Sequence, residues 1–290
     1  MYGMSHVMLS ATVFLCAQCA AAAAGRVGDQ QRSDAFSAAE IVGKSVAANT
    51  NDWRAQPEYA FREHDIKSKI GPGGQAHVEQ SKTFEVSMIE GSPYSRLVAI
   101  NNEPLSKTQE RAEQVKLQRE TERRQSESPG QKNDRVAKYQ EERSEEHVLM
   151  QQMAEAFTFT LAGEERVGGV DCYVLDANPK PGYHPAVEKA RVLTGMKGRL
   201  WIDKEHFHWV KVQAEVISPV EFGLFIAKVK PGTCFELEQA PVGKVWLPKR
   251  FTETVNASVL GFYGMRTREE EQYSGYHQTM LRAADSTPAR

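Results

Sequence analysis

The sequence predicts an α+β fold in which antiparallel strands form one large sheet. Segments that alternate apolar and polar residues recur at short, regular spacing over residues 59–100 and 157–277, which is typical of an antiparallel sheet or barrel. Between them, residues 103–157 are rich in Glu, Lys, Arg and Gln, which favour helices. The sheet is therefore expected to be interrupted by a helical insertion.

Length and composition are those of an ordinary globular protein. The 290 residues are 40% hydrophobic and 26% charged, which allows a single sizeable core. The formal net charge is -2, so the chain has no overall attraction to nucleic acid or anionic lipid. We therefore expect no nucleic acid partner.

The first 24 residues are typical of a secretory signal peptide. Residues 6–25, HVMLSATVFLCAQCAAAAAG, form an apolar run closed by small residues. The run is too short and too rich in alanine for a permanent membrane anchor, and no other apolar stretch approaches the ~18 residues that a span needs. We predict cleavage near Ala24 and a periplasmic or secreted mature protein.

A helix is predicted near the start of the mature chain. Residues 33–50 carry an apolar stripe at helical spacing, made of Phe36, Ala39, Val42 and Val46. Ser33 precedes this stripe and is the expected N-cap, because its hydroxyl can accept a hydrogen bond from the first turn.

Strands account for most of the remaining chain. A meander of three strands is predicted over residues 59–70, 77–91 and 92–100, with a turn at Gly71–Gly74. Two further strands over 157–179 are joined around Gly168 and Gly169. The later strands are expected at residues 196–203, 207–217, 222–229, 233–239, 244–259 and 262–277.

The insertion is predicted to be two helices, residues 103–125 and 134–157, with a loop between them. The first helix is almost wholly polar. The second gains an apolar stripe only near its end, at Leu149, Met153, Ala156 and Phe157. We expect that end to pack on the core and the rest to be a hydrated face; the alternative is a mobile lid over a cavity.

Removal of the leader leaves two cysteines, Cys172 and Cys234. An oxidising compartment permits a disulfide between them, and two separately buried thiols are the alternative. Neither cysteine belongs to a CxxC motif, so the spacing predicts neither a redox site nor a zinc site.

The stretch DKEHFHWVKV, residues 203–212, holds the strongest candidate for metal chemistry. His206 and His208 are two residues apart, a spacing that can place two imidazoles on one side of a strand. A hairpin turn over 203–206 explains the same residues without a metal, because Asp203 can bond the backbone ahead of it. The chain has no HExxH, no GxSxG and no phosphate-binding glycine loop. We therefore predict no catalytic residue, metal or cofactor.

Apolar residues gather on strand faces and must be buried against another layer. The predicted helices either fill the space against these faces or leave an apolar pocket suited to an acyl chain. The candidate ligand-binding residues are Leu200, Ile202, Val210, Val212, Phe222, Leu224, Leu237, Phe251 and Val255.

Three stretches resemble the periplasmic lipoprotein-carrier (LolA/LolB-like) family. They are GRLWIDKEHFHWVKVQAEV at 198–216, VGGVDCYVLDANP at 167–179 and WLPKRFTETV at 246–255. The resemblance covers most of 150–276 and, more weakly, 56–100. It implies an incomplete antiparallel β-barrel, a curved sheet of about 10–11 strands wrapped around helices. It also implies that acyl chains of lipids or lipoproteins bind the concave apolar face, without a metal or cofactor.

The expected organisation is a single domain over residues 25–281 with the helical insertion at 103–157, followed by a disordered tail over 282–290. The expected function is that of an exported, monomeric, non-enzymatic binding protein, either a carrier or an envelope sensor. Two alternatives stay open. One is an exported hydrolase or metal protein that uses His206 and His208, and the other is a protein-binding module that uses the charged helices.

Overall fold

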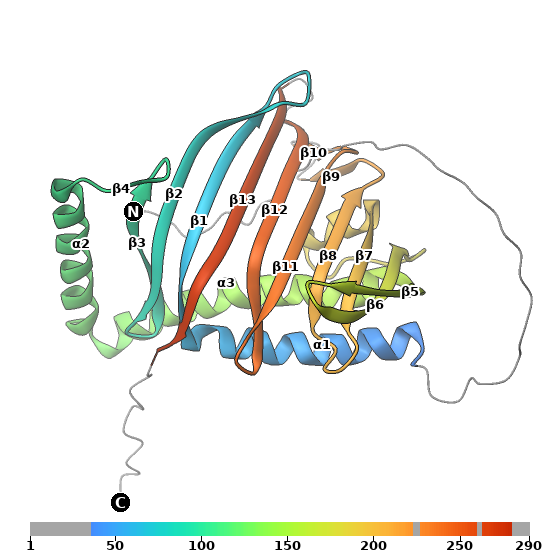
Figure 1. Cartoon of the computed structure of the whole chain (residues 1–290), viewed down its shortest axis with the longest axis horizontal. Coiled ribbons are helices and arrows are strands. Elements are labelled where there is room, and N and C mark those ends of the chain that lie inside the picture. The colour runs from blue at the N-terminus through green and yellow to red at the C-terminus, as the bar shows by residue number, and fades with distance from the viewer. Residues whose placement is uncertain (1–35, 223–226, 260–262, 280–290) are drawn as a thin grey trace, which may run out of the picture.

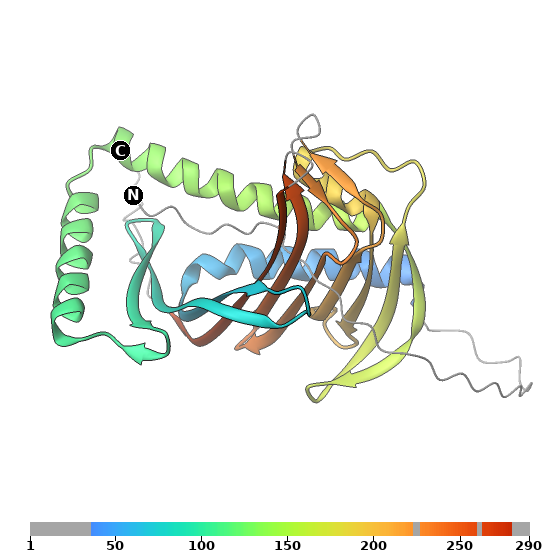
Figure 2. The same cartoon turned by 90° about the horizontal axis from the view of Figure 1, so that it is seen from above.

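The computed structural model describes residues 36–222, 227–259 and 263–279. Its centre is an antiparallel sheet of 13 strands that curves around two long helices, α1 (Ala38–Ala55) and α3 (Pro129–Ala156) (Figures 1 and 2). The sheet does not close into a barrel, since β4 and β5 remain its two edges. The predicted α+β class with a half-open curved sheet is confirmed, although it has more strands than expected.

The predicted signal peptide at 1–24 and the predicted tail at 282–290 lie outside the described residues. In the part of the chain that is described, no helix combines the length and the apolar character needed to cross a membrane.

The strands follow one another mostly as hairpins. Their bounds are β1 (Tyr59–Ile70), β2 (Ala76–Ile89), β3 (Ser92–Ile100), β4 (Glu103–Pro104), β5 (Phe157–Val167), β6 (Val170–Pro179), β7 (Met196–Asp203), β8 (Trp209–Val216), β9 (Val220–Phe222), β10 (Ala227–Val229), β11 (Cys234–Val242), β12 (Val245–Val259) and β13 (Tyr263–Gln278). Their order in the sheet is β4-β3-β2-β1-β13-β12-β11-β8-β7-β6-β5, and β10 pairs with both β9 and β12. The single strand predicted over 222–229 was wrong, because β9 and β10 are two short strands that pair with each other.

Each long helix begins at a serine that starts a capping box. Ser37 caps α1: its hydroxyl accepts from the Glu40 N–H at 3.3 Å, and Glu40 accepts from the Ser37 N–H at 2.8 Å. Ser106 and Ser128 cap α2 (Lys107–Gln125) and α3 in the same way. The N-cap of α1 is therefore Ser37, and the prediction of Ser33 was wrong. The predicted loop at 126–133 is also shorter than expected, because α3 already begins at Pro129.

The core lies between the helices and one side of the sheet. Ile41 of α1 and Leu175, Met196 and Ile202 of the strands are fully buried. They join the end of α3 and a 3-10 helix, η2 (Glu188–Gly195), in one apolar cluster. The sequence did not predict η2.

The apolar stripe predicted for α1 is only partly correct, because Val42 and Val46 pack on the core while Phe36 and Ala39 are exposed. At the end of α3, Met153 and Ala156 pack on the core as expected.

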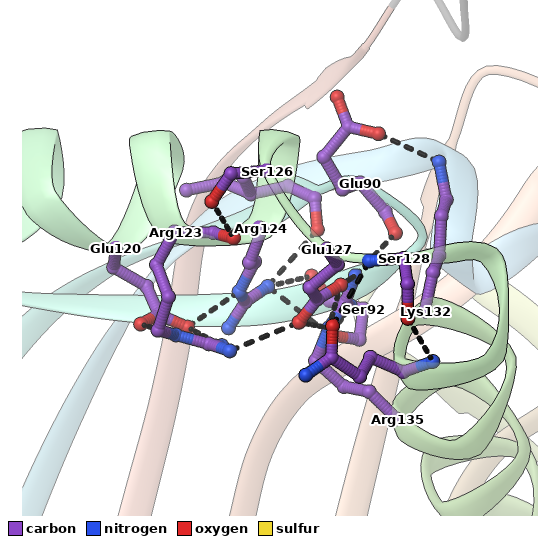
Figure 3. Close-up of polar contacts among 12 residues, drawn as sticks. Glu90, Ser92, Glu120, Arg123, Arg124, Ser126, Glu127, Ser128, Lys132 and Arg135 are labelled. Carbon is purple, nitrogen blue, oxygen red and sulfur yellow. Dashed lines mark hydrogen bonds and ion pairs between the residues drawn. The ribbon is translucent and has the colours of Figure 1, made fainter.

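A buried arginine, Arg124, and a partly buried one, Arg135, fasten the helical insertion to the turn between β2 and β3 (Figure 3). Arg124 donates to the carbonyl oxygens of Ile89 (2.9 Å), Ser92 (2.8 Å) and Pro93 (3.1 Å). Arg135 donates to the Ser92 hydroxyl at 2.6 Å. We call Arg124 and Arg135, together with these acceptors, the arginine clamp.

Acidic residues of the insertion complete the arginine clamp. Glu120 pairs with Arg124 at 2.6 Å, and Glu127 pairs with Arg135 at 2.6 Å. The turn that they grip is tight, with Glu90 at φ 50 and Gly91 at φ 89, as a two-residue hairpin turn requires. The outward face of α2 is exposed, as the hydrated-face interpretation expected, while its C-terminal end is fixed to the sheet.

Replacing Arg124 with alanine is expected to lower the free energy of unfolding by about 2 kcal/mol, because three carbonyl acceptors lose a donor and Glu120 loses one of its two arginine partners. Trypsin should then cut within α2 faster than in the wild type. The control is Arg119→Ala, since Arg119 is exposed on the same helix. Equal denaturation and proteolysis of the two variants would contradict a fastening role for Arg124.

Candidate functional site

The concave face of the sheet has two chemically different halves. We call the inward side chains of β5, β6, β7, β8 and β11 the apolar half, and those of β1, β12 and β13 the acidic half. One row of paired residues crosses both halves, from apolar to acidic: Leu161, Leu175, Leu200, Val212, Leu237, Phe251, Glu271 and Asp65. The concave face is therefore not uniformly apolar, in contrast to the expectation from the sequence.

The apolar half is closely packed where the helices cover it, whereas Leu161 of β5 is 46% exposed. A hollow of about 20 Å³ remains beneath the end of α3. That volume is on the order of what one water molecule needs. The sequence left open whether the helices fill the space against the strands or leave an apolar pocket. In this conformation they fill it. Its lining residues are Met153, Phe157, Phe159, Ala177, Leu193, Met196, Gly198, Leu200, Trp209, Val212, Gln213, Ala214 and Phe235.

The candidate ligand-binding residues are distributed unevenly around this hollow. Leu200 and Val212 line it directly. Ile202 and Val255 are buried at 0% and 1% exposure. The half-buried members of the set are Phe222, Leu237 and Phe251. Leu224 lies outside the described residues.

Val210 is on the opposite face from the one expected. The expectation assumed unbroken alternation from Val210 to Val216, but the pairing shifts between Trp201 and Ile202. Trp201 pairs with Lys211 and Ile202 with Trp209, so Val210 is the extra residue of a β-bulge. It packs on the outer face with Cys172, Val174, Trp201 and Trp246.

The acidic half holds carboxyl groups whose protonation is shifted. Burial, followed by the charge of Asp65, raises the pKa of Glu63 to about 8. Burial also raises the pKa of Asp65 to about 6, against the opposing charge of Lys67. The pKa of Glu271 is raised by burial as well.

Sequence reasoning missed this acidic half, although one signal was present. Glu63 and Asp65 have the same parity along β1 as Phe61, so an inward Phe61 implies inward carboxylates. Phe61 indeed contacts the rings of Tyr273 and Tyr276 of β13 at centroid distances of 5.8 Å and 5.3 Å.

An open groove of about 1160 Å³ lies at the hairpin ends of the apolar side. The turns between β5 and β6, β7 and β8, and β11 and β12 surround it. Its lining combines both charge signs with a few apolar side chains: Glu164, Glu165, Arg166, Gly169, Val170, Asp171, Cys172, Asp203, Lys204, Glu205, His206, His208, Pro241, Gly243, Lys244 and Trp246.

His206 and His208 line this groove, and both have structural roles there. The Asp203 carboxylate accepts from the N–H groups of Glu205 (3.1 Å) and His206 (2.7 Å), which makes the predicted turn. His208 Nδ1 lies 2.6 Å from Asp52 Oδ2 of α1. No group of three or more His, Cys, Asp or Glu side chains within the described ranges is arranged to hold a metal ion.

Asp52 links the helix to two hairpins. Its other oxygen, Oδ1, accepts from the Trp246 N–H at 3.0 Å, and the His208 ring stacks on Trp246 at 5.6 Å. Asp52 is 4% exposed, so both of its oxygens depend on these partners.

No disulfide joins Cys172 and Cys234. Cys172 lies on β6 and Cys234 on β11, with β7 and β8 between them. Three strand spacings amount to about 14 Å, and a disulfide needs Cα atoms within about 7 Å. Burial raises the pKa of Cys172 to about 11, so it remains a thiol at neutral pH and is a poor nucleophile.

The resemblance of this chain to known proteins is one of structure. No protein-family model and no curated protein matches it. Solved structures that it resembles include a domain from Vibrio parahaemolyticus described as outer membrane lipoprotein-sorting (10% identity, TM-score 0.32, covering 83% of this chain and 94% of that one). A DUF1329 family protein from Desulfovibrio piger has 10% identity and a TM-score of 0.30, covering 82% and 92%. A LolA superfamily protein from Nitrosomonas europaea has 10% identity and a TM-score of 0.30, covering 85% and 96%.

At such TM-scores each likeness is one of overall outline.

Replacing Asp52 with alanine is expected to lower the free energy of unfolding by about 3 kcal/mol, because His208 and the Trp246 N–H both lose a buried acceptor. Chemical denaturation measures the effect. Asp171→Ala provides the control, since the Asp171 side chain is 70% exposed in the same groove. A similar small loss in both variants would show that Asp52 does not hold α1 to the hairpins.

Proposed function

We propose that this chain is an exported, non-enzymatic binding protein whose ligand is an acyl chain of a lipid or lipoprotein. The observation that carries the proposal is the hollow under α3, whose lining is apolar except for Gln213. A lining of this kind favours hydrocarbon over polar ligands. The proposed ligand-contacting residues are the inward-facing candidates, with Leu200 and Val212 nearest the hollow.

Ligand entry requires the end of α3 to move. The hollow measures about 20 Å³, whereas small-molecule pockets are typically ~300–1,000 Å³. Met150 and Met153 of α3 are only partly buried against the core. Their unbranched side chains can repack as the helix shifts, so the cover over the hollow is adaptable.

The arginine clamp fixes the N-terminal end of α3, so we place the motion at its C-terminal end. Arg135 fixes the first turns of α3 to the β2–β3 turn through 2.6 Å and 3.0 Å hydrogen bonds. At the other end, Gln152 accepts from the Tyr183 hydroxyl at 2.7 Å and the Ala186 N–H at 3.2 Å, and the Ala156 carbonyl accepts from the Lys180 N–H at 2.8 Å. A shift of the C-terminal end therefore requires these hydrogen bonds to break while Met150 and Met153 repack.

Export is part of this proposal. It is based on the apolar run at 6–25, which is closed by small residues as in secretory leaders. A mature protein acting as a monomer in the periplasm or outside the cell would meet lipoproteins and free lipids.

A second candidate function is the binding of a protein segment in the groove at the hairpin ends. The groove of about 1160 Å³ favours it, because its lining offers carboxylates, lysines and the Trp246 ring together. Native mass spectrometry of protein purified from its own host distinguishes the two functions. Retained lipid supports the first, and a retained peptide or protein supports the second.

Replacing Met153 with glutamate is expected to weaken binding of a fluorescent fatty acid at least tenfold, because a charge would then lie along the acyl path. Titration of the fluorescent probe measures the dissociation constant. The matched control is Val78→Glu, since Val78 is 63% exposed on β2, away from the hollow. Saturable binding that is unchanged in both variants, or no binding by the wild type, would overturn the acyl proposal.

A further inference from the structure

We propose that the acidic half of the concave face is a proton-controlled latch between β1 and β13. In its protonated form the cluster lets the two strands pack together, and its ionisation favours their local separation. This device acts on the sheet itself and does not depend on which ligand the protein binds.

The strand register brings the carboxyl groups together. Asp65 of β1 pairs directly with Glu271 of β13, and Glu63 pairs with Tyr273 on the same inward face. Side chains of directly paired residues have Cβ atoms about 4.5–5.5 Å apart. Like charges at this separation repel, so a fully ionised cluster opposes the pairing of the two strands.

Each neighbouring element adds charged or polar groups to the cluster. β1 itself adds Lys67, which pairs with Glu269 of β13 at 3.2 Å. Lys82 of β2 lies opposite Asp65, and Glu253 of β12 lies opposite Glu269. The inward positions of this region therefore comprise five carboxyl groups (Glu63, Asp65, Glu253, Glu269 and Glu271) and two lysines (Lys67 and Lys82).

At least one carboxyl oxygen of this cluster lacks a hydrogen-bond donor. Asp65 Oδ1 is buried and has no hydrogen-bond partner. The Tyr273 hydroxyl donates to Glu271, and the Tyr276 hydroxyl donates to the Pro248 carbonyl at 2.7 Å, so neither hydroxyl serves Asp65 through these bonds. A buried oxygen without a donor favours the protonated form of a carboxyl group.

The direction of the pH effect follows from proton linkage. Burial raises the pKa of Glu63 from 4.5 to about 8, so the closed strands keep this proton while opened strands release it. Opening therefore becomes easier as pH rises from 4.5 toward 8, by up to about tenfold per pH unit for one proton. Above about pH 8 both states are ionised, and the effect ends.

Native-state hydrogen exchange tests the latch. After correction for the intrinsic exchange rate, protection of amides in β1 and β13 is expected to fall at least about tenfold between about pH 6 and pH 8. Amides of β6 and β7 should change much less over the same interval. In Glu63→Gln, which mimics the protonated side chain, the fall in β1 and β13 should shrink to less than about threefold.

Glu79→Gln is the matched control, because Glu79 of β2 is paired with Lys69 and its side chain is 47% exposed. It should keep the wild-type fall in protection. A wild-type fall that is equal in β1 and β6, or one that persists undiminished in Glu63→Gln, overturns the proposal. Should Glu63→Gln fail to fold, Asp65→Asn and Glu271→Gln are measured in its place against the same criterion.

Discussion

The structure depends on the burial of one concave sheet face against two helices. A half-open sheet exposes its inner face unless another layer covers it, and here α1 and the end of α3 provide that layer over the apolar half. The helices bury apolar side chains on only one part of this face. The reason is that β5 to β8 and β11 present a continuous apolar row to them, whereas β1 and β13 present carboxyl groups. That difference divides the molecule into a packed side and an acidic side.

The insertion contributes to both sides of this division. Its second helix ends in the apolar cluster, while its first turns are fixed by the arginine clamp at the far end of the sheet. Long polar side chains therefore hold one end of α3, and apolar packing together with the hydrogen bonds of Gln152 holds the other. Hydrogen bonds with fixed geometry resist displacement, whereas flexible methionine side chains tolerate it, so the two ends of one helix differ in how they can move.

The acidic half gives the open side of the sheet a different physical character. Its carboxyl groups are half-buried, and their protonation couples the pairing of β1 and β13 to pH. Together with a closed apolar hollow, this describes a scaffold with two adjustable regions that meet where β11 pairs with β12. Asp52 stiffens the region between α1 and the hairpin ends by joining His208 to the Trp246 backbone.

Local patterns in the sequence determined the class of fold and most of its long elements. Alternating strands, a helical insertion and the hairpin turn at Asp203 could all be predicted, because each depends on residues close in the chain. Only the tertiary structure decided which faces meet. The bulge that turns Val210 outward depends on the register in which β7 pairs with β8. The two strands that separate Cys172 from Cys234, and the pairing of Asp65 with Glu271, depend on residues tens to hundreds of positions apart. Strand parity specifies two faces but not which one is covered, and no local pattern contains that choice.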